Sequence, residues 1–520
     1  MKIVKFIYVL YKIQLLSPIG IYSLFSSIYS SGINLMTLLH IAGKKYGNNI
    51  ALIDDRETIT YQRLLAESIN LAHCLKQKTH LHSGQKVGFL CRNHVSLVKS
   101  IFAVSRLGAN VYLLNTEMSK NQLNQFVARH DFDLIIYDEE LSELLEQSHY
   151  SKKKVLSYHD RLPAINNLQL ESYALPAIPR TYGSKIVLQT SGTTGISKDA
   201  AHKPSLFNYL HPFIAFIKRL RILKYHSAYI ATPIYHGYGL AVLLLFIPLG
   251  KTVVVSCGFN AKKACNLVHE HQVEVVTVVP SMLQKMLESD AEKLASLRCV
   301  ASGGAKLHTK LVNQTFMILG RVLYNLYGTS EAGLNFIATP QDLEYSPLTV
   351  GKKIKGMRVK FLDRDMNELN NGKIGQLCIQ NDWSIKNRNK SWIQTGDLGY
   401  QDENGYYFLC GRTDDMVVSG GENVYPIEVE QVLMEHTLIE DVAIIGVQDD
   451  LFGQRLQAYV LPKENQNLTE KELLEWLRPR VARFQLPKEI KIVNSLPYTS
   501  LGKLNKKQLI SVNMGKEAKM

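Results

Sequence analysis

The sequence predicts a layered α/β protein: a large N-terminal domain of largely parallel sheets and helices, and a small α+β C-terminal domain on a hinge. A chain of 520 residues is longer than a single hydrophobic core usually supports, so two or more domains are expected. From Ile33 onward, short apolar strands alternate with helical segments, which is typical of buried sheets covered by helices. After about Cys410 the composition changes, which indicates a second domain.

The elements of the large domain follow from hydrophobic periodicity. Short apolar runs rich in β-branched residues predict strands, and longer periodic stretches predict helices. The expected strands are Ile50–Asp54, Thr58–Tyr61, Lys86–Cys91, Ala109–Leu114, Leu134–Tyr137, Ile186–Leu188, Ala228–Ala231, Thr252–Val255, Val273–Val278 and Val300–Ser302. The expected helices are Tyr61–Leu75, Val98–Leu107 and Gln122–His130.

The small domain follows a segment, Asp414 to Tyr425, that is rich in Asp, Ser, Gly and Asn and can serve as a hinge or exposed loop. Roughly a hundred residues remain, enough for a separate domain. Its expected elements are helix Ile427–Glu435, strands Val442–Val447 and Leu456–Leu461, helix Thr469–Arg480 and strand Glu489–Val493. We therefore expect an N-terminal segment 1–32, a large domain 33–411 and a small mobile domain 412–520 with its hinge near Asp414.

Composition excludes several classes of protein. A hydrophobic content of 46% with 20% charged residues is that of a folded chain. The net charge of +14 could indicate nucleic acid or an anionic membrane, but lysines and arginines are scattered and no basic run is interleaved with aromatics. We therefore expect no nucleic-acid partner. The seven cysteines are widely spaced without a CxxC pair, which argues against a zinc site or a disulfide framework and favours thiols in a reducing compartment.

The most informative motif is TSGTTGISK, a loop that begins at the end of the apolar strand Ile186–Leu188. Glycines let the backbone approach a phosphate, while backbone N–H groups, hydroxyls and one lysine supply donors and charge. A Ser/Thr/Gly-rich turn of no special function has a similar composition. The lysine stands three residues after the last glycine, so this is not the loop of P-loop ATPases. The residues concerned are Thr190, Ser191, Gly192, Thr193, Thr194, Gly195 and Lys198.

This loop resembles the phosphate loop of the adenylate-forming (AMP-binding) superfamily, which includes acyl-CoA synthetases, luciferases and nonribosomal adenylation domains. Further motifs of that superfamily follow in the expected order, so the resemblance covers nearly the whole chain. In the YGTSEA motif it implies that Tyr327 stacks on adenine beside Gly328, that Thr329 contacts the α-phosphate and that Glu331 holds Mg²⁺. A planar ring, a hydroxyl and a hard carboxylate suit those tasks.

Two short motifs, TGD and GRTDD, lie fifteen residues apart. The resemblance implies that Asp397 accepts both ribose hydroxyls, that Arg412 contacts ribose or phosphate, and that Asp414 is the hinge between the domains. The SGGA loop, with Gly303, Gly304 and Ala305, is expected to lie along adenine and the acyl group.

The subclass is indicated by SGGENVYP, which resembles the loop of acyl- and aryl-CoA ligases that lines the CoA tunnel through Gly420, Gly421 and Glu422. The segment LPYTSLGKL resembles the motif whose lysine, here Lys503, bridges the attacking carboxylate and the α-phosphate. His236, in PIYHGYG, is expected to lie near the substrate carboxylate, although a buried core histidine is nearly as common a role. Stretches at 91–94, 113–116 and 137–140 resemble the long-chain fatty acyl-CoA ligases and are interpreted as fold positions.

The resemblance implies an acyl-CoA synthetase: ATP with Mg²⁺ and a carboxylic acid, favoured to be a fatty acid, give acyl-AMP and pyrophosphate, and CoA then takes the acyl group. One alternative is an adenylation enzyme that loads an acyl carrier protein, and another is a catalytically weak nucleotide- or lipid-binding homologue. The phosphate loop departs from the family pattern, because Ser197 replaces the proline before the lysine and Asp199 replaces the glycine after it. A carboxylate at 199 could pair with Lys198 or repel pyrophosphate.

The N-terminal segment differs from the rest of the chain. Met1 to Ser31 contains no acidic residue, and Lys2, Lys5 and Lys12 share one helical face among large apolar residues. One interpretation is an amphipathic stretch in the interface of an anionic membrane, and the other is a helix packed on the body. A signal peptide is disfavoured, because a secreted enzyme would lack ATP. We expect a cytoplasmic enzyme, with peripheral contact to the inner face of a membrane under the first interpretation.

Overall fold

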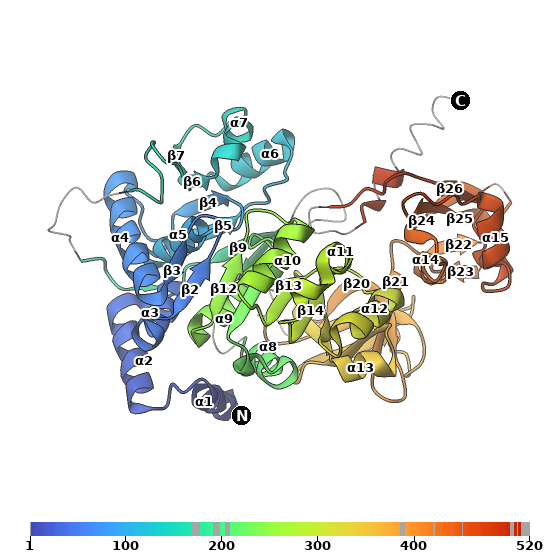
Figure 1. The fold of residues 1–520 in the computed structure, drawn as a ribbon, viewed down its shortest axis with the longest axis horizontal. Helices are drawn as coiled ribbons and strands as arrows, with labels where there is room; N and C mark the ends of the chain where they lie inside the picture. Colours follow the sequence, from blue (N-terminus) through green and yellow to red (C-terminus); the bar gives the residue numbers. More distant parts are fainter. Residues whose placement is uncertain are drawn as a thin grey trace. The chain divides into compact units, whose positions relative to one another are not determined.

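The computed structural model describes residues 2–168, 177–190, 198–202, 209–384, 391–419, 422–449, 451–499, 504–506 and 508–510. The chain divides into two compact units. The first comprises Met1–Val278 with Lys285–Ala301, and the second comprises Val279–Gln284 with Ser302–Met520. Each unit is an arrangement of sheets and helices, shown along the chain in Figure 1.

The first sheet of the first unit has six strands in the order β10-β9-β5-β4-β6-β7. All neighbours are parallel except β10, which returns antiparallel to β9. The crossover helices α5 (Val95–Arg106) and α6 (Lys120–His130) connect β4 to β5 and β5 to β6. The strands are β4 (Lys86–Leu90), β5 (Asn110–Leu113), β6 (Leu134–Tyr137), β7 (Lys153–Leu156), β9 (Ile186–Thr190) and β10 (Lys198–His202).

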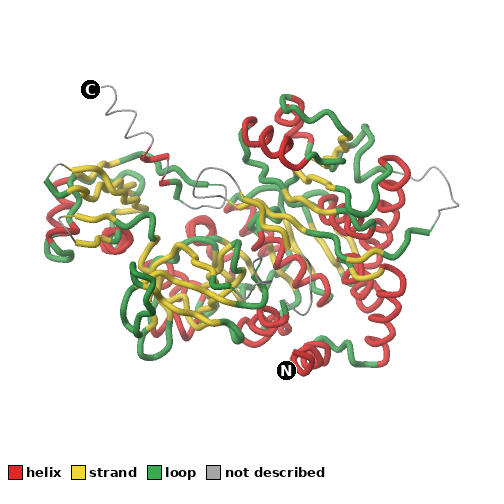
Figure 2. The backbone as a smooth tube through the Cα atoms, turned by 180° about the vertical axis from the view of Figure 1, so that it is seen from behind, coloured by secondary structure: helices red, strands yellow, loops and turns green. Residues whose placement is uncertain are grey.

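A second sheet contains the run β14-β13-β11-β12-β2-β3. The pairs that join β11 to β12, β11 to β13 and β12 to β2 are parallel, and only the short β3 is antiparallel to β2. Its strands are β2 (Ile50–Ile53), β3 (Thr58–Thr60), β11 (Ser227–Ile230), β12 (Thr252–Val255), β13 (Val275–Val278) and β14 (Cys299–Gly303). Figure 2 shows these strands in yellow between red helices.

The remaining helices of this part of the chain pack on the sheets or on one another. Every residue of α5 is buried, and α5 contacts α3 and α4. The α-helices are α1 (Lys2–Lys12), α2 (Pro18–Ser31), α3 (Leu35–Tyr46), α4 (Tyr61–Thr79), α7 (Ser142–Glu146), α8 (Leu210–Ala215), α9 (Gly237–Phe246), α10 (Ala261–Glu270) and α11 (Pro280–Asp290). Short helical turns lie at η1 (Glu139–Leu141), η2 (Phe216–Leu220), η3 (Ile222–Lys224), η4 (Ile247–Leu249) and η5 (Ala291–Leu294).

The N-terminal helices are fixed to the body by a short parallel pair, β1 (Gly32–Ile33) with β8 (Thr181–Tyr182). At Gly32 φ is +87°, and a Cβ there would lie 2.2 Å from the carbonyl oxygen of Thr181, so only glycine fits. Among the described residues, no helix is both long and apolar enough to cross a membrane.

The second unit contains an antiparallel run in the order β18-β19-β20-β21-β17-β16-β15. The strands are β15 (Leu323–Thr329), β16 (Gly333–Ala338), β17 (Thr349–Lys353), β18 (Arg358–Leu362), β19 (Gly375–Gln380), β20 (Ile393–Gln401) and β21 (Tyr407–Arg412). Helices α12 (Thr309–Leu319) and α13 (Pro340–Tyr345) accompany them.

A five-stranded sheet follows, in the order β23-β22-β25-β24 with β26 beside β25. It has its own hydrophobic core, built around Val429, Leu433, Ile444 and Leu473. The elements are β22 (Val417–Ser419), β23 (Glu422–Val424), α14 (Pro426–Met434), β24 (Ile439–Asp449), β25 (Gly453–Pro462), α15 (Glu470–Leu477), η7 (Arg483–Gln485) and β26 (Glu489–Ile492).

The predicted fold class is confirmed, and the differences concern details. The parallel sheets expected in the large domain are those of the first unit, whereas the run from β15 to β21 is antiparallel. Helix α5 begins three residues earlier than expected, because His94 caps it. The domain boundary expected at 411 and 412 differs from the division into compact units and stays a prediction. All seven cysteines are thiols, six of them buried.

Candidate active site

In the second unit, the side chains of Tyr327 and Arg412 both bond to the carboxylate of Asp397. The hydroxyl of Tyr327, on β15, donates to Asp397 Oδ2, and Arg412 Nη1 donates to Oδ1 at 3.2 Å. Asp397 and Arg412 are direct cross-strand partners on β20 and β21, so the antiparallel register itself brings the carboxylate and the guanidinium together. Sequence motifs separated by seventy residues therefore form one cluster.

The electrostatics of this cluster favour a neutral Tyr327 and a charged Arg412. Burial raises the pKa of Tyr327 well above its usual value, and the charge of Asp397 adds to the effect. Burial lowers the pKa of Arg412, but Asp397, Asp414 and Asp415 outweigh it and leave the pKa raised. Arg412 Nε also donates to Asp414 Oδ1 at 2.9 Å, so this arginine connects the residue proposed for ribose to the residue proposed for the hinge.

The YGTSEA motif forms the end of β15 and the turn that leads into β16. Thr329 Oγ1 accepts the N–H of Ala332 at 3.1 Å and so closes the turn, while Glu331 is exposed. A Cβ at Gly328 would lie 2.5 Å from the carbonyl oxygen of Gly333, which explains glycine at this position. The turn exposes the carboxylate of Glu331 to solvent, and a carboxylate is a hard oxygen ligand of the kind that Mg²⁺ accepts.

The SGGA loop leaves β14, with Gly303 buried and Gly304 exposed at φ +81°. Lys306 follows it, and its buried Nζ has no hydrogen-bond partner among the described residues. Burial lowers the pKa of Lys306 from 10.5 to about 8, Lys506 acts in the same direction, and Glu430 opposes the shift. Lys506 Nζ lies 2.8 Å from Glu430 Oε1. Sequence reasoning missed this group, because its members are lone charged residues far apart in the chain.

His236 lies at the N-cap position of α9, in the first unit. Asn93 holds the preceding loop in place: its Nδ2 donates to the carbonyl of Thr232 at 3.0 Å, and its Oδ1 accepts the N–H of Ile234 at 2.7 Å. Two residues after His236, the Tyr238 hydroxyl donates to the carbonyl of Ala301 at 2.7 Å. The segment expected near the acyl group is therefore held by Asn93 before His236 and by the Tyr238 hydroxyl after it.

Several residues predicted to belong to the site lie outside the described residues. These are Ser191, Gly192, Thr193, Thr194 and Gly195 of the phosphate loop, Ser197, Gly420, Gly421 and Lys503. The described residues on either side of these gaps are paired with one another. Thr190 of β9 pairs with Lys198 of β10, Ser419 pairs with Glu422, and Tyr498 forms a bridge with Leu504.

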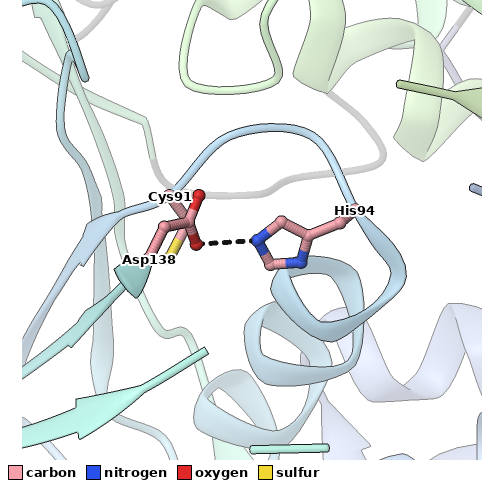
Figure 3. A group of neighbouring side chains, drawn as sticks. All are labelled: Cys91, His94 and Asp138. Carbon is pink, nitrogen blue, oxygen red and sulfur yellow. Dashed lines mark hydrogen bonds and ion pairs between the residues drawn. The ribbon is translucent and has the colours of Figure 1, made fainter. Parts of the chain in front are cut away.

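Cys91, His94 and Asp138 form a buried group of metal-ligating residue types, with ligand atoms within 4.8 Å of one another (Figure 3). The ring nitrogens of His94 and the carboxylate of Asp138 already form hydrogen bonds. His94 Nδ1 accepts the N–H of Leu97, and Nε2 lies 2.9 Å from Asp138 Oδ1, so the ring is a donor toward the carboxylate. Burial, with the charge of Asp138 adding to it, raises the pKa of the Cys91 thiol well above its usual value, which disfavours the thiolate that a metal requires.

This group instead joins two strand ends to a helix. Asp138, after β6, accepts the N–H of Arg92 at 2.7 Å and the hydroxyl of Ser157 at 2.5 Å, while His94 caps α5. The expectation that positions 91–94 and 137–140 support the fold agrees with these contacts.

Comparisons with known proteins are consistent with the geometry. The family described as AMP-binding enzyme matches residues 39–386, and the AMP-binding enzyme C-terminal domain matches residues 428–503. A 2-succinylbenzoate–CoA ligase of Geobacillus sp. (strain WCH70) is 27% identical, over 88% of this chain and 94% of that protein. A fatty acid–[acyl-carrier-protein] ligase of Streptomyces coeruleorubidus is 25% identical, over 88% of this chain and 92% of that protein.

Among solved structures, o-succinylbenzoate CoA synthetase of Bacillus subtilis with its acyl-adenylate intermediate has a TM-score of 0.79 at 24% identity, covering 91% of this chain and 97% of that one. An amide bond synthetase of Marinactinospora thermotolerans has a TM-score of 0.80 at 22% identity, covering 91% and 99%. These likenesses show a shared fold. The chain belongs to the AMP-binding enzyme family, because that family matches more than half of it. Its enzyme class is that of the ATP-dependent, AMP-forming acid–thiol ligases.

Replacing Asp138 by Asn is expected to lower the free energy of unfolding by about 2 kcal/mol at pH 7, because the new amide N–H₂ cannot accept the N–H of Arg92. Burial raises the pKa of Asp138, but its hydrogen bonds with His94, the N–H of Arg92 and Ser157 lower it below 3.8 overall. The stabilisation is therefore present above about pH 4 and is lost as the pH falls through the folded pKa. Calorimetric melting of D138N measures the change, and the exposed substitution Asp365→Asn should leave the melting temperature unaltered.

Replacing Lys306 by Met is expected to stabilise the protein by between about 1 and 3 kcal/mol at pH 7. A lysine whose pKa falls from 10.5 to about 8 is charged at a cost below pH 8, and that cost disappears above pH 10.5. The gain in melting temperature over the wild type should therefore be larger at pH 7 than at pH 10. An equal gain at both pH values would contradict the assigned charge penalty. The exposed Lys373→Met is the control.

Proposed function

We propose that this enzyme activates a carboxylic acid with ATP to form an acyl-adenylate and pyrophosphate, and then transfers the acyl group to CoA. The observation that carries the proposal is the cluster of Tyr327, Asp397 and Arg412, in which three separate motifs converge on one carboxylate. A carboxylate oriented by an aromatic hydroxyl and a guanidinium is suited to accept the hydroxyls of a ribose. The ring of Tyr327 would then lie beside adenine, together with the Gly303–Gly304–Ala305 backbone.

The second part of the proposal assigns the phosphates. The turn closed by Thr329 would supply a hydroxyl to the α-phosphate, and Glu331 would hold Mg²⁺, which neutralises charge on the phosphates when bound. The loop between Thr190 and Lys198 would hold the departing pyrophosphate. The backbone of Lys198 and Asp199 pairs with that of Thr190 and Gln189 across β10 and β9.

Lys503 is proposed to bridge the substrate carboxylate and the α-phosphate during adenylation. The small domain, residues 412–520, would then turn about Asp414, withdraw Lys503 and present the loop Gly420–Gly421–Glu422 to CoA. Support for the hinge comes from Arg412, which bonds both Asp397 and Asp414 and could exchange these partners. Segment 1–32 would precede a large domain 33–411.

We infer a fatty acid as the preferred substrate, because positions 91–94, 113–116 and 137–140 resemble the long-chain ligases. His236, held by the loop that Asn93 fixes, would lie near the carboxylate. A second candidate is an aromatic acid, since several relatives are named 2-succinylbenzoate–CoA ligases. A carrier protein as acceptor is a third candidate, favoured by the relative named as a fatty acid–[acyl-carrier-protein] ligase.

Pyrophosphate release across an acid panel separates these candidates. We expect release with medium- and long-chain fatty acids, and AMP with acyl-CoA once CoA is added. Faster release with 2-succinylbenzoate would replace the fatty acid, and transfer to a phosphopantetheinylated carrier without CoA consumption would replace CoA. Background rates with every acid would indicate a catalytically weak homologue. Asp397→Ala is the inactive reference, because it removes the carboxylate of the cluster.

Replacing Lys503 by Ala should slow adenylation on the order of 100-fold or more, as loss of one preorganised charge does. Consumption of synthetic acyl-AMP by CoA should continue at the wild-type rate, because the lysine is proposed to act in the first half-reaction alone. The measurement is single-turnover kinetics of each half-reaction, with Lys373→Ala as control. Equal losses in both half-reactions would refute this role.

A further inference from the structure

Helices α1 and α2 present a surface of large apolar side chains. Of twenty-eight exposed large hydrophobic residues among the described ones, eleven lie between Ile3 and Ile33. The most exposed include Ile3, Tyr11, Ile19, Tyr22, Phe25 and Tyr29, each with 67–71% of its surface accessible. Scattered exposed apolar residues are normal, but a concentration on two consecutive helices marks an interaction site.

Helix α2 has its polarity inverted relative to an ordinary surface helix. Its buried residues are Gly20, Ser23, Ser27 and Ser31, all small, while its large apolar residues face outward. A Cβ at Gly20 would lie 2.5 Å from the carbonyl of Gln14, so the small residues permit close packing. A helix that faces water on one side turns its large apolar residues inward. Small residues inward and large ones outward suit an apolar medium on the outer side.

The two helices are anchored to the body, so this surface is a fixed feature. Helix α1 contacts α8 and α2 contacts α3, as Figure 1 also shows. Lys45 Nζ donates to the carbonyl of Ile13 at 2.8 Å, and Ser31 Oγ lies 2.9 Å from His40 Nδ1. Lys5 Nζ lies 3.3 Å from His211 Nε2. Of the two interpretations of this segment from sequence, packing on the body is therefore correct for the inner face, and the outer face still needs a partner.

The charges around the surface are positive. No acidic residue precedes Asp54, whereas five lysines do. Cations lie over the tyrosines of the surface: Lys44 Nζ is 5.5 Å from the Tyr22 ring centre, and the Arg180 guanidinium is 3.9 Å from that of Tyr29. Aromatic rings with long basic side chains beside them are typical of the headgroup level of a membrane, where the rings enter the interface and the cations meet phosphates.

We propose that the outer face of α1 and α2 docks the enzyme on an anionic lipid bilayer, with the helices lying in the interface. No described helix could cross the membrane, so contact is peripheral. A second copy of the chain fits less well, because a symmetric interface would bring the same lysines of both copies together without an acidic partner. The surface precedes residue 39, where the match to the family begins, so the inference does not depend on which acid is activated.

The test is flotation of the full-length protein with vesicles. We expect binding to vesicles of phosphatidylcholine with about one-third phosphatidylglycerol, and roughly tenfold weaker binding to phosphatidylcholine alone. The variant Tyr22→Ser/Phe25→Ser/Tyr29→Ser should reduce the partition coefficient at least about tenfold, because three interfacial side chains are lost. Helix propensity is nearly unchanged by these replacements. The matched control is Met317→Ser/Leu451→Ser/Phe484→Ser, which removes three exposed apolar side chains elsewhere and should bind like wild type.

A second variant, Lys12→Glu, should weaken binding to anionic vesicles severalfold while leaving binding to neutral ones unchanged. Circular dichroism and ATP-dependent pyrophosphate exchange verify folding independently of lipid, so failure of this proposal and failure of the proposed function are separable. Wild type that stays unbound on both vesicles, or a triple variant that floats like wild type, overturns the proposal. So does a wild-type dimer that the triple substitution converts to a monomer without any vesicle binding.

Discussion

The first unit depends on the turn that follows β4. His94 in this turn caps α5 and meets Asp138 at the end of β6, so one buried carboxylate fixes a helix start and two strand ends. Asn93, one residue earlier, holds residues 232–234, the loop that follows β11 of the second sheet. A buried charge costs much free energy unless it is hydrogen-bonded, and here the Asp138 carboxylate accepts from His94, Ser157 and the N–H of Arg92. The bonds of Asn93 also fix the loop that leads to His236, so the position of His236 depends on the packing of residues outside the proposed site.

In the second unit the equivalent constraint is the register between β20 and β21. Because Asp397 and Arg412 are cross-strand partners, a slip by one residue would separate them and turn each side chain to the other face. Gly396 has φ +78°, and a Cβ there would lie 2.8 Å from Arg412 Nη2, so the glycine of the TGD motif makes room for the arginine. Gly396 is therefore required for packing, independently of the ribose-binding role proposed for Asp397.

Sequence reasoning succeeded where a local pattern decides the structure. The apolar runs at Lys86–Leu90 and Leu134–Tyr137 are parallel strands, and the motif residues Tyr327, Asp397 and Arg412 do converge. It was incomplete where distant residues decide. Nothing local reveals that Lys306 and Glu430 are neighbours, or that the strands from β15 to β21 are antiparallel. Asn93 was assigned to the fold from resemblance, but its bonds to residues 232 and 234 depend on tertiary packing.

The N-terminal helices illustrate why a sequence pattern can support two interpretations at once. Serines recurring every three or four residues in α2 look like a polar face, and a polar face is normally assigned to water. In the structure that face is buried, since small side chains allow α2 to lie close to α3, and the Ser31 hydroxyl bonds to His40. The apolar face is consequently left outside, with basic residues at its edge. The same segment thus packs on the body and, through its opposite side, fits a lipid surface, so the two interpretations describe its two faces.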